Sequence, residues 1–118
     1  MIYSLFYSLL SSTIYSLFAR PHCIANCTLY IKDILQNEII IDFDQNDNYT
    51  FNFLEKYNLE KEAQKSRHFV NNTDGLASMI SLGAGYSVLA SDLASNLIKR
   101  RELIDLMPGK FLDLSDIC

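Results

Sequence analysis

The sequence has few of the residues that mark specialised classes of protein. Its 118 residues include four glycines, two prolines, three cysteines and no tryptophan. So few glycines and prolines exclude collagen-like and low-complexity chains, and a small, odd number of cysteines argues against a disulfide framework. Hydrophobic residues make up 49% of the chain and charged residues 20%, so the chain can bury a core as one small domain.

Positive charge is also scarce. There are 10 lysines and arginines against 14 aspartates and glutamates, which gives a formal net charge of -4. A free-standing nucleic-acid-binding domain needs a basic face that meets phosphates, and the one basic cluster here is residues 99–101. We therefore expect no direct DNA contact by this chain.

No charged side chain occurs in the first 19 residues. A signal peptide would carry Lys or Arg before its apolar stretch, and serine and threonine residues interrupt this stretch too often for a strong membrane span. We expect residues 1–13 to be an atypical apolar segment that is not inserted in a membrane. A small membrane-anchored protein that uses residues 1–19 is the alternative.

From residue 14 onward, strand-like and helix-like segments alternate. Strands are predicted at residues 14–19, 38–43, 67–71, 86–90 and 102–106, and helices at residues 30–36, 49–57, 73–82 and 92–100. Three consecutive isoleucines at 39–41 are typical of a strand that is buried on both faces. This alternation predicts an α/β fold, a Rossmann-like open and mostly parallel sheet with helices on both faces.

The two helices nearest the C-terminus have the clearest patterns. We expect Met79 and Ile80 to be buried against the sheet and Gly83 to end the first of these helices. Asp92 is predicted to cap the second helix. The apolar residues expected to face inward from that helix are Leu93, Leu97 and Ile98.

Two patterns suggest a metal site, and both are incomplete. Residues 42–47 place oxygen ligands at alternate positions, but Asp47 and Phe53 stand where a calcium loop needs Gly and Glu. His22, Cys23 and Cys27 are close in sequence but fall short of the four ligands of a structural zinc site. We predict no bound metal.

Signatures of catalysis and of a nucleotide cofactor are equally weak. Gly83 and Gly85 follow a predicted helix and open a strand, which is the reverse of the dinucleotide-binding arrangement. No Gly-x-Ser-x-Gly motif occurs, and no nucleophile is accompanied by His and a carboxylate in a recognisable pattern. The chain is therefore predicted to have no cofactor and no enzymatic activity.

A polar segment, residues 71–74, follows one predicted strand and opens a helix. Ligands of open α/β sheets bind outside the carboxyl ends of the strands, and free N–H groups at a helix N-terminus can receive a carboxylate or a phosphate. The simpler interpretation is a helix cap formed by Asn72 or Thr73. The two interpretations are compatible.

Residues 67–90, RHFVNNTDGLASMISLGAGYSVLA, resemble the effector domain of LysR-type transcriptional regulators. Residues 101–106 resemble the family's ending, and residues 18–21 and 33–44 resemble earlier passages. The likeness covers residues 14–109, which we expect to form one effector-binding subdomain, with residues 110–118 as a tail. Residues 42–47 are most similar to the subgroup of arginine- and lysine-responsive regulators, also described as replication-initiation inhibitors.

This resemblance implies a non-enzymatic half of a cleft for a small effector, lysine or arginine. The candidate effector-binding residues are Asn71, Asn72, Thr73, Asp74, Asp42 and Asp44. It also implies a bacterial, cytoplasmic protein that is a homo-oligomer when intact, of which this chain is a fragment without the DNA-binding helix-turn-helix. The alternative is a lobe of a periplasmic-type solute-binding protein, whose lobes share this architecture.

Overall fold

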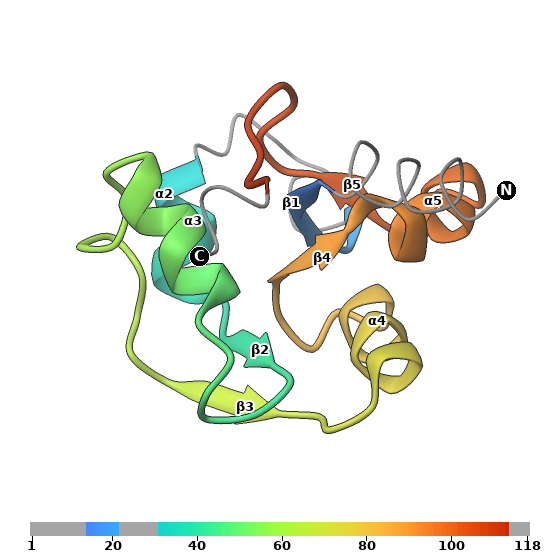
Figure 1. Cartoon of the computed structure of the whole chain (residues 1–118), viewed down its shortest axis with the longest axis horizontal. Helices are drawn as coiled ribbons and strands as arrows, with labels where there is room; N and C mark the ends of the chain where they lie inside the picture. The colour runs from blue at the N-terminus through green and yellow to red at the C-terminus, as the bar shows by residue number, and fades with distance from the viewer. Residues whose placement is uncertain (1–13, 22–30, 114–118) are drawn as a thin grey trace, which may run out of the picture.

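The computed structural model describes residues 14–21 and 31–113, which form alternating strands and helices (Figure 1). The order is the predicted one, with element ends that differ by a few residues. The elements are β1 (Tyr15–Ala19), α2 (Ile31–Asn37), β2 (Ile40–Asp42), α3 (Tyr49–Lys56), β3 (Arg67–Phe69), α4 (Thr73–Ser81), β4 (Ser87–Ala90), α5 (Ser91–Lys99) and β5 (Ile104–Asp105).

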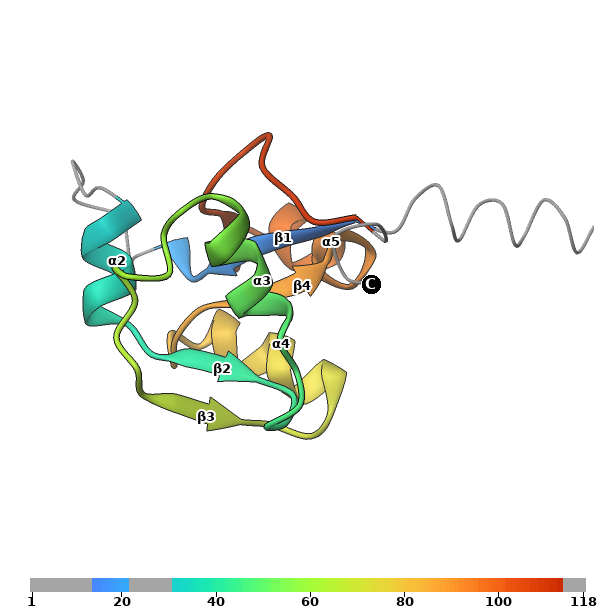
Figure 2. The same ribbon diagram turned by 60° about the vertical axis from the view of Figure 1, so that its left-hand side comes forward.

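Two strand groups join into one sheet. β1 pairs antiparallel with β4 on one side and with β5 on the other, while β2 and β3 are parallel and lie side by side (Figure 2). A parallel bridge between Ile40 and Tyr86 links the groups, through the bonds from Ile41 N to Tyr86 O and from Tyr86 N to Ile39 O, each 3.0 Å. The order is thus β3-β2-β4-β1-β5. The predicted open α/β sheet is confirmed, and β1 alone runs against the direction of the other described strands.

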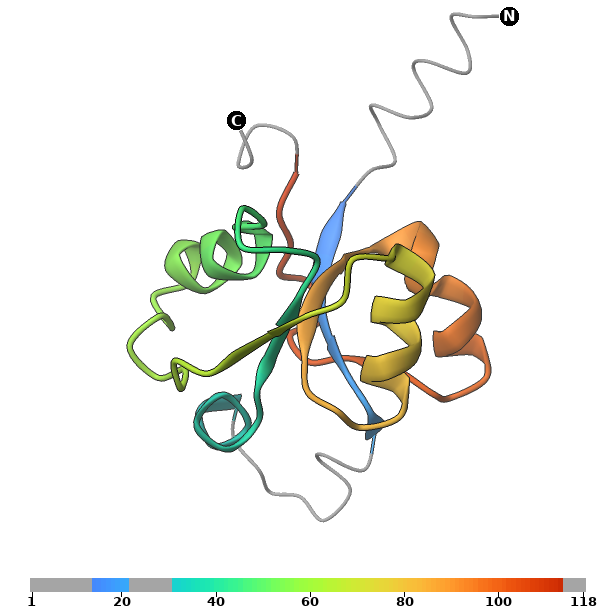
Figure 3. The same cartoon turned by 90° about the horizontal axis from the view of Figure 1, so that it is seen from below.

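Helices cover both faces of this sheet, as predicted. α2 and α3 lie on one side and α4 and α5 on the other (Figure 3). Successive strand residues point to opposite faces, so Leu17 and Ile40 join the core under α2 and α3, whereas Phe18 and Ile41 join the core under α4 and α5. The burial of Ile40 and Ile41 confirms that β2 is covered on both faces.

The predicted inner face of α4 is partly correct. Ile80 is fully buried, but 39% of Met79 is exposed, so its predicted burial is wrong. Leu76, Ala77 and Ile80 form the buried stripe, and Met79 lies beside that stripe because each helical residue turns about 100° from the last.

Two glycines shape the turn from α4 to β4. Gly83 has a φ of 91° and its N–H donates to Ile80 O, while Ala84 N donates to Met79 O. These two bonds form a Schellman motif, which confirms the predicted helix end at Gly83. At Gly85 an added Cβ would lie 2.1 Å from the carbonyl oxygen of Ile39. The close approach of β4 to the end of β2 therefore requires glycine at this position.

The predicted start of α5 is wrong. The N-cap is Ala90, with no side-chain cap, and Asp92 lies within the first turn. β4 passes into α5 without a loop, and Ser91 N donates to Ile14 O at 2.9 Å, which fixes the helix start upstream of Asp92. Ile98 is 40% exposed, so its inward orientation is also wrong.

Residues 110–113, which belong to the predicted C-terminal tail, pack against the domain. Leu112 is fully buried and exchanges two backbone hydrogen bonds with Tyr15, of 2.9 and 2.8 Å. The Tyr57 hydroxyl, on the turn after α3, donates to Phe111 O and accepts from Phe111 N, each at 2.9 Å. The core therefore extends at least to Leu112.

Within the described ranges, no helix has the length and apolar character needed to cross a membrane. The predictions for residues 1–13, for residues 114–118 and for His22, Cys23 and Cys27 lie outside the described residues.

Candidate functional site

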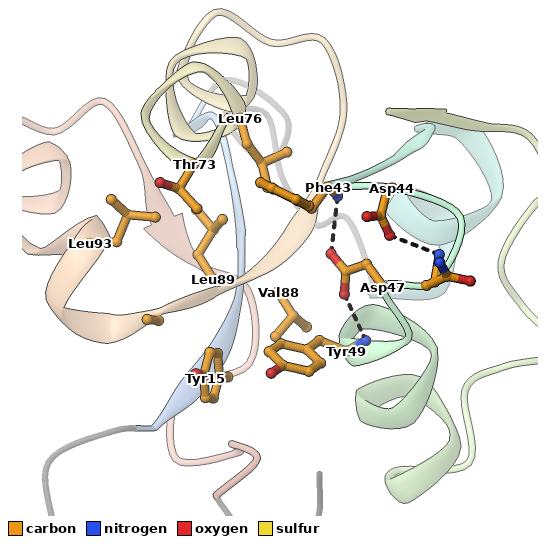
Figure 4. Close-up of a pocket in the computed structure, with 12 residues that line it drawn as sticks. Tyr15, Phe43, Asp44, Asp47, Tyr49, Thr73, Leu76, Val88, Leu89 and Leu93 are labelled. Atoms are coloured by element: carbon orange, nitrogen blue, oxygen red, sulfur yellow. Dashed lines mark hydrogen bonds between the residues drawn. The ribbon is translucent and has the colours of Figure 1, made fainter. Parts of the chain in front are cut away.

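A pocket of about 430 Å³ opens at the edge of the sheet where β2 and β4 end and β1 begins. The parallel directions of β2 and β4 bring their carboxyl ends to this edge, and the reversed β1 contributes its first residue. The wall has apolar side chains, which include Leu76, Val88 and Leu93, and polar and aromatic ones, which are Tyr15, Phe43, Asp44, Asn46, Asp47, Tyr49 and Thr73. Figure 4 shows Thr73 of α4 across the pocket from the two aspartates.

The aspartates belong to residues 43–47, which we call the acidic loop. Asp47 Oδ2 accepts from Phe43 N at 3.0 Å, and its Oδ1 accepts from Tyr49 N at 3.1 Å. Asp44 Oδ1 accepts from Asn46 N at 2.8 Å. These bonds fix the carboxylates at the wall, and no lysine or arginine is among the described residues that line it. The pocket therefore favours positive charge in a ligand.

Two tyrosines form the aromatic part of the wall. The rings of Tyr15 and Tyr49 have centroids 4.9 Å apart and planes inclined at 72°. Burial raises the pKa of Tyr15, and the neighbouring Tyr49 raises it further, so the Tyr15 phenol is neutral at physiological pH. Neutral rings at a negatively charged pocket can contact both the aliphatic and the cationic parts of a ligand.

The start of α4 supplies hydrogen-bond donors. Asn72 Oδ1 accepts from Gly75 N at 2.8 Å, which confirms the predicted helix cap. The N–H groups of Thr73 and Asp74 donate to no described residue, and Thr73 lines the pocket. A carboxylate at this position would be stabilised by the positive end of the helix dipole.

The six predicted site residues thus have different surroundings. Asp44 and Thr73 line the same pocket. Asn71, Asn72 and Asp74 are exposed beside it and do not line it.

Asp42 is fully buried and turned away from the pocket. Its Oδ2 accepts from Arg67 Nη2 at 2.7 Å and from Arg67 Nε at 3.1 Å, and its Oδ1 accepts from Thr50 Oγ1 at 2.8 Å. Burial raises the pKa of the Asp42 carboxyl, while the hydrogen bonds from Arg67 and Thr50 oppose that rise. Both carboxylate oxygens of Asp42 therefore accept hydrogen bonds from Arg67 or Thr50, and Asp42 does not line the pocket.

The candidate residues did not include Tyr15, Asp47, Tyr49 and Leu93, which line the pocket. Asp47 has a signal in the sequence, because it belongs to the same acidic run, residues 42–47, as Asp44. Tyr15 carries no such signal, since the reversed direction of β1 is what brings it to this edge.

Comparison with known proteins rests on structure. No family model matches the sequence, and no curated protein matches it. The C-terminal domains of a LysR family protein from Agrobacterium tumefaciens align with a TM-score of 0.71 and 22% identity over 85% of this chain and 49% of that one. The chain has the fold of LysR-type effector domains.

Other LysR-type structures agree with this. The effector binding domain of AmpR from Citrobacter freundii aligns with a TM-score of 0.70 and 11% identity, covering 87% of this chain and 50% of that one. Full-length LysG from Corynebacterium glutamicum with bound effector Arg aligns with a TM-score of 0.62 and 18% identity, covering 81% and 33%. The chain spans between a third and a half of the length of these three structures.

Proposed function

We propose that this chain is part of a LysR-type transcriptional regulator and supplies one half of the cleft that binds a small-molecule effector. The structures that share its fold are regulators and effector-binding domains, which supports a non-enzymatic, cytoplasmic protein and does not favour a solute-binding lobe. Homo-oligomer formation in the intact regulator is part of the same proposal.

The effector that fits the pocket best is an amino acid with a cationic side chain, lysine or arginine. The observation that carries this assignment is one pocket with the Asp44 and Asp47 carboxylates on one wall and the first turn of α4 on another. An α-carboxylate would accept from the N–H groups of Thr73 and Asp74, and the cationic side chain would face the aspartates. LysG with bound Arg is a solved example of this fold with such a ligand.

Affinity for the chain alone should be weak. In the LysR-type arrangement that the sequence resembles, the effector lies between two subdomains, and this chain supplies one. A ligand on one wall leaves much of its surface in water, whereas ligand pockets normally bury most of it. We expect dissociation constants in the millimolar range for lysine and arginine.

Titration of lysine and arginine into the chain, followed by NMR of backbone amides, tests the assignment. Asp44→Asn should weaken arginine binding about tenfold, because it removes one charge-assisted contact, and Thr73→Ala should weaken binding less. Glu60→Gln is the matched control, since Glu60 is an exposed carboxylate outside the pocket wall. Equal affinities for Asp44→Asn, Glu60→Gln and the unmodified chain would contradict the assignment.

Asn72→Ala separates capping from binding. Loss of the bond to Gly75 N should lower stability by about 1 kcal/mol. Because Asn72 does not line the pocket, arginine affinity should change far less than in Asp44→Asn.

A further inference from the structure

Arg67 lies outside the pocket wall but contacts the acidic loop. Its Nη2 donates to Asp42 Oδ2 at 2.7 Å and to the backbone oxygen of Asp47 at 2.9 Å. One guanidinium therefore connects the last residue of β2 to the last residue of the acidic loop.

The orientation of this guanidinium is fixed from several sides. Its carbon lies 4.6 Å from the ring centroid of Phe51 and 4.9 Å from that of Phe69. Asp42, its ionic partner, accepts a further bond from Thr50. Lysine could not reproduce these contacts, because its ammonium is neither a planar fork nor a stacking surface.

The position of Asp47 controls the rest of the acidic loop. Its carboxylate accepts from the N–H groups of Phe43 and Tyr49, and its own N–H donates to Asp44 O at 3.0 Å. A shift of the Asp47 backbone would therefore move both carboxylates of the pocket wall.

We infer that Arg67 is a positioning residue of the effector site, which holds the acidic loop so that Asp44 and Asp47 face a cationic ligand. This inference rests on the proposed function for the identity of the ligand. We expect Arg67 to make no contact with the ligand itself. Its replacement should change the affinity only for ligands with a positively charged side chain.

Two variants test this role. Arg67→Lys keeps the charge and loses the fork. The double variant Arg67→Met with Asp42→Asn removes the whole ion pair, which avoids the strong destabilisation of an unpaired buried charge. Both should weaken arginine binding at least tenfold and leave unchanged the binding of citrulline, an analogue whose side chain is uncharged. Arg100→Lys is the matched control, since Arg100 forms an exposed ion pair with Glu102 at 2.8 Å, and it should bind arginine like the unmodified chain.

A second measurement needs no ligand. Amide hydrogen exchange at Phe43 and Tyr49 reports the two bonds to the Asp47 carboxylate, and it should accelerate at least fivefold in both Arg67 variants but not in Arg100→Lys.

The outcomes separate the two proposals. If the unmodified chain binds arginine and both Arg67 variants bind it within twofold, the positioning role is overturned and the proposed function stands. If the unmodified chain binds no arginine, the proposed function fails, and exchange decides the role of Arg67 in the loop. Unchanged exchange in both variants would overturn that role.

Discussion

Leu112→Ala should destabilise the domain more than its place near the C-terminus suggests. The Leu112 side chain is fully buried among core residues, and alanine keeps the two backbone hydrogen bonds to Tyr15. The substitution then removes only buried side-chain atoms, about three methylene equivalents. Each of these contributes ~0.8 kcal/mol to the free energy of unfolding. With the cavity that remains, the cost is about 3 kcal/mol, which is a large part of a total stability of about 5–15 kcal/mol.

Thermal unfolding followed by circular dichroism measures this effect. A loss of that size should lower Tm by about 10–20 °C for a domain of this length. Leu82→Ala is the matched control, because 70% of Leu82 is exposed, and it should change stability by less than about 0.5 kcal/mol. If the two variants melt within two degrees or so of each other, the reasoning that Leu112 belongs to the core is refuted.

Two further substitutions test one buried and one half-buried polar group. Tyr86→Phe should raise stability by about 1 kcal/mol, measured by urea unfolding, because the buried Tyr86 hydroxyl has no hydrogen-bond partner among the described residues; a loss of stability would show that the hydroxyl has a partner. Burial raises the pKa of Asp105 above its ordinary value of 3.8, so the folded state favours the protonated form, and the stability this group contributes is lost as pH rises through the folded pKa. Asp105→Asn keeps an oxygen acceptor for Met107 N and should therefore raise Tm at pH 7, with the gain vanishing below pH 3.8; a gain that is the same at pH 3 and pH 7 would contradict this.

The elements of the fold could be predicted because their signals are local. The isoleucine run at 39–41 predicts a strand buried on both faces, and the helical spacing of apolar residues predicts an inner side of α4 that includes Ile80, although Met79 is 39% exposed. Gly83 marks the end of that helix for a backbone reason, its positive φ. Each of these predictions depends on residues within a few positions of one another.

The site could be predicted only in part because its contacts are distant in sequence. Arg67 and Asp42 are 25 positions apart, and Tyr15 reaches the pocket because β1 runs against its neighbours. Neither fact has a local signature. Asp42 is different, because its orientation follows from strand periodicity, which places its side chain on the same face as Ile40, under α3. The face alone does not keep Asp42 from the pocket, because Val88 belongs to the same core and lines the pocket; the bonds from Arg67 and Thr50 occupy the Asp42 carboxylate instead.

The dependence of binding on ligand charge tests the central claim most directly. Arginine and citrulline have nearly the same shape, and citrulline lacks the positive charge on the side chain, so the ratio of their dissociation constants isolates the contribution of the Asp44 and Asp47 wall. NMR titration of the unmodified chain should give at least tenfold tighter binding for arginine, with amide shifts at Thr73, Asp74 and the acidic loop. Equal affinities for the two ligands, or arginine shifts confined to residues far from this pocket, would contradict the account.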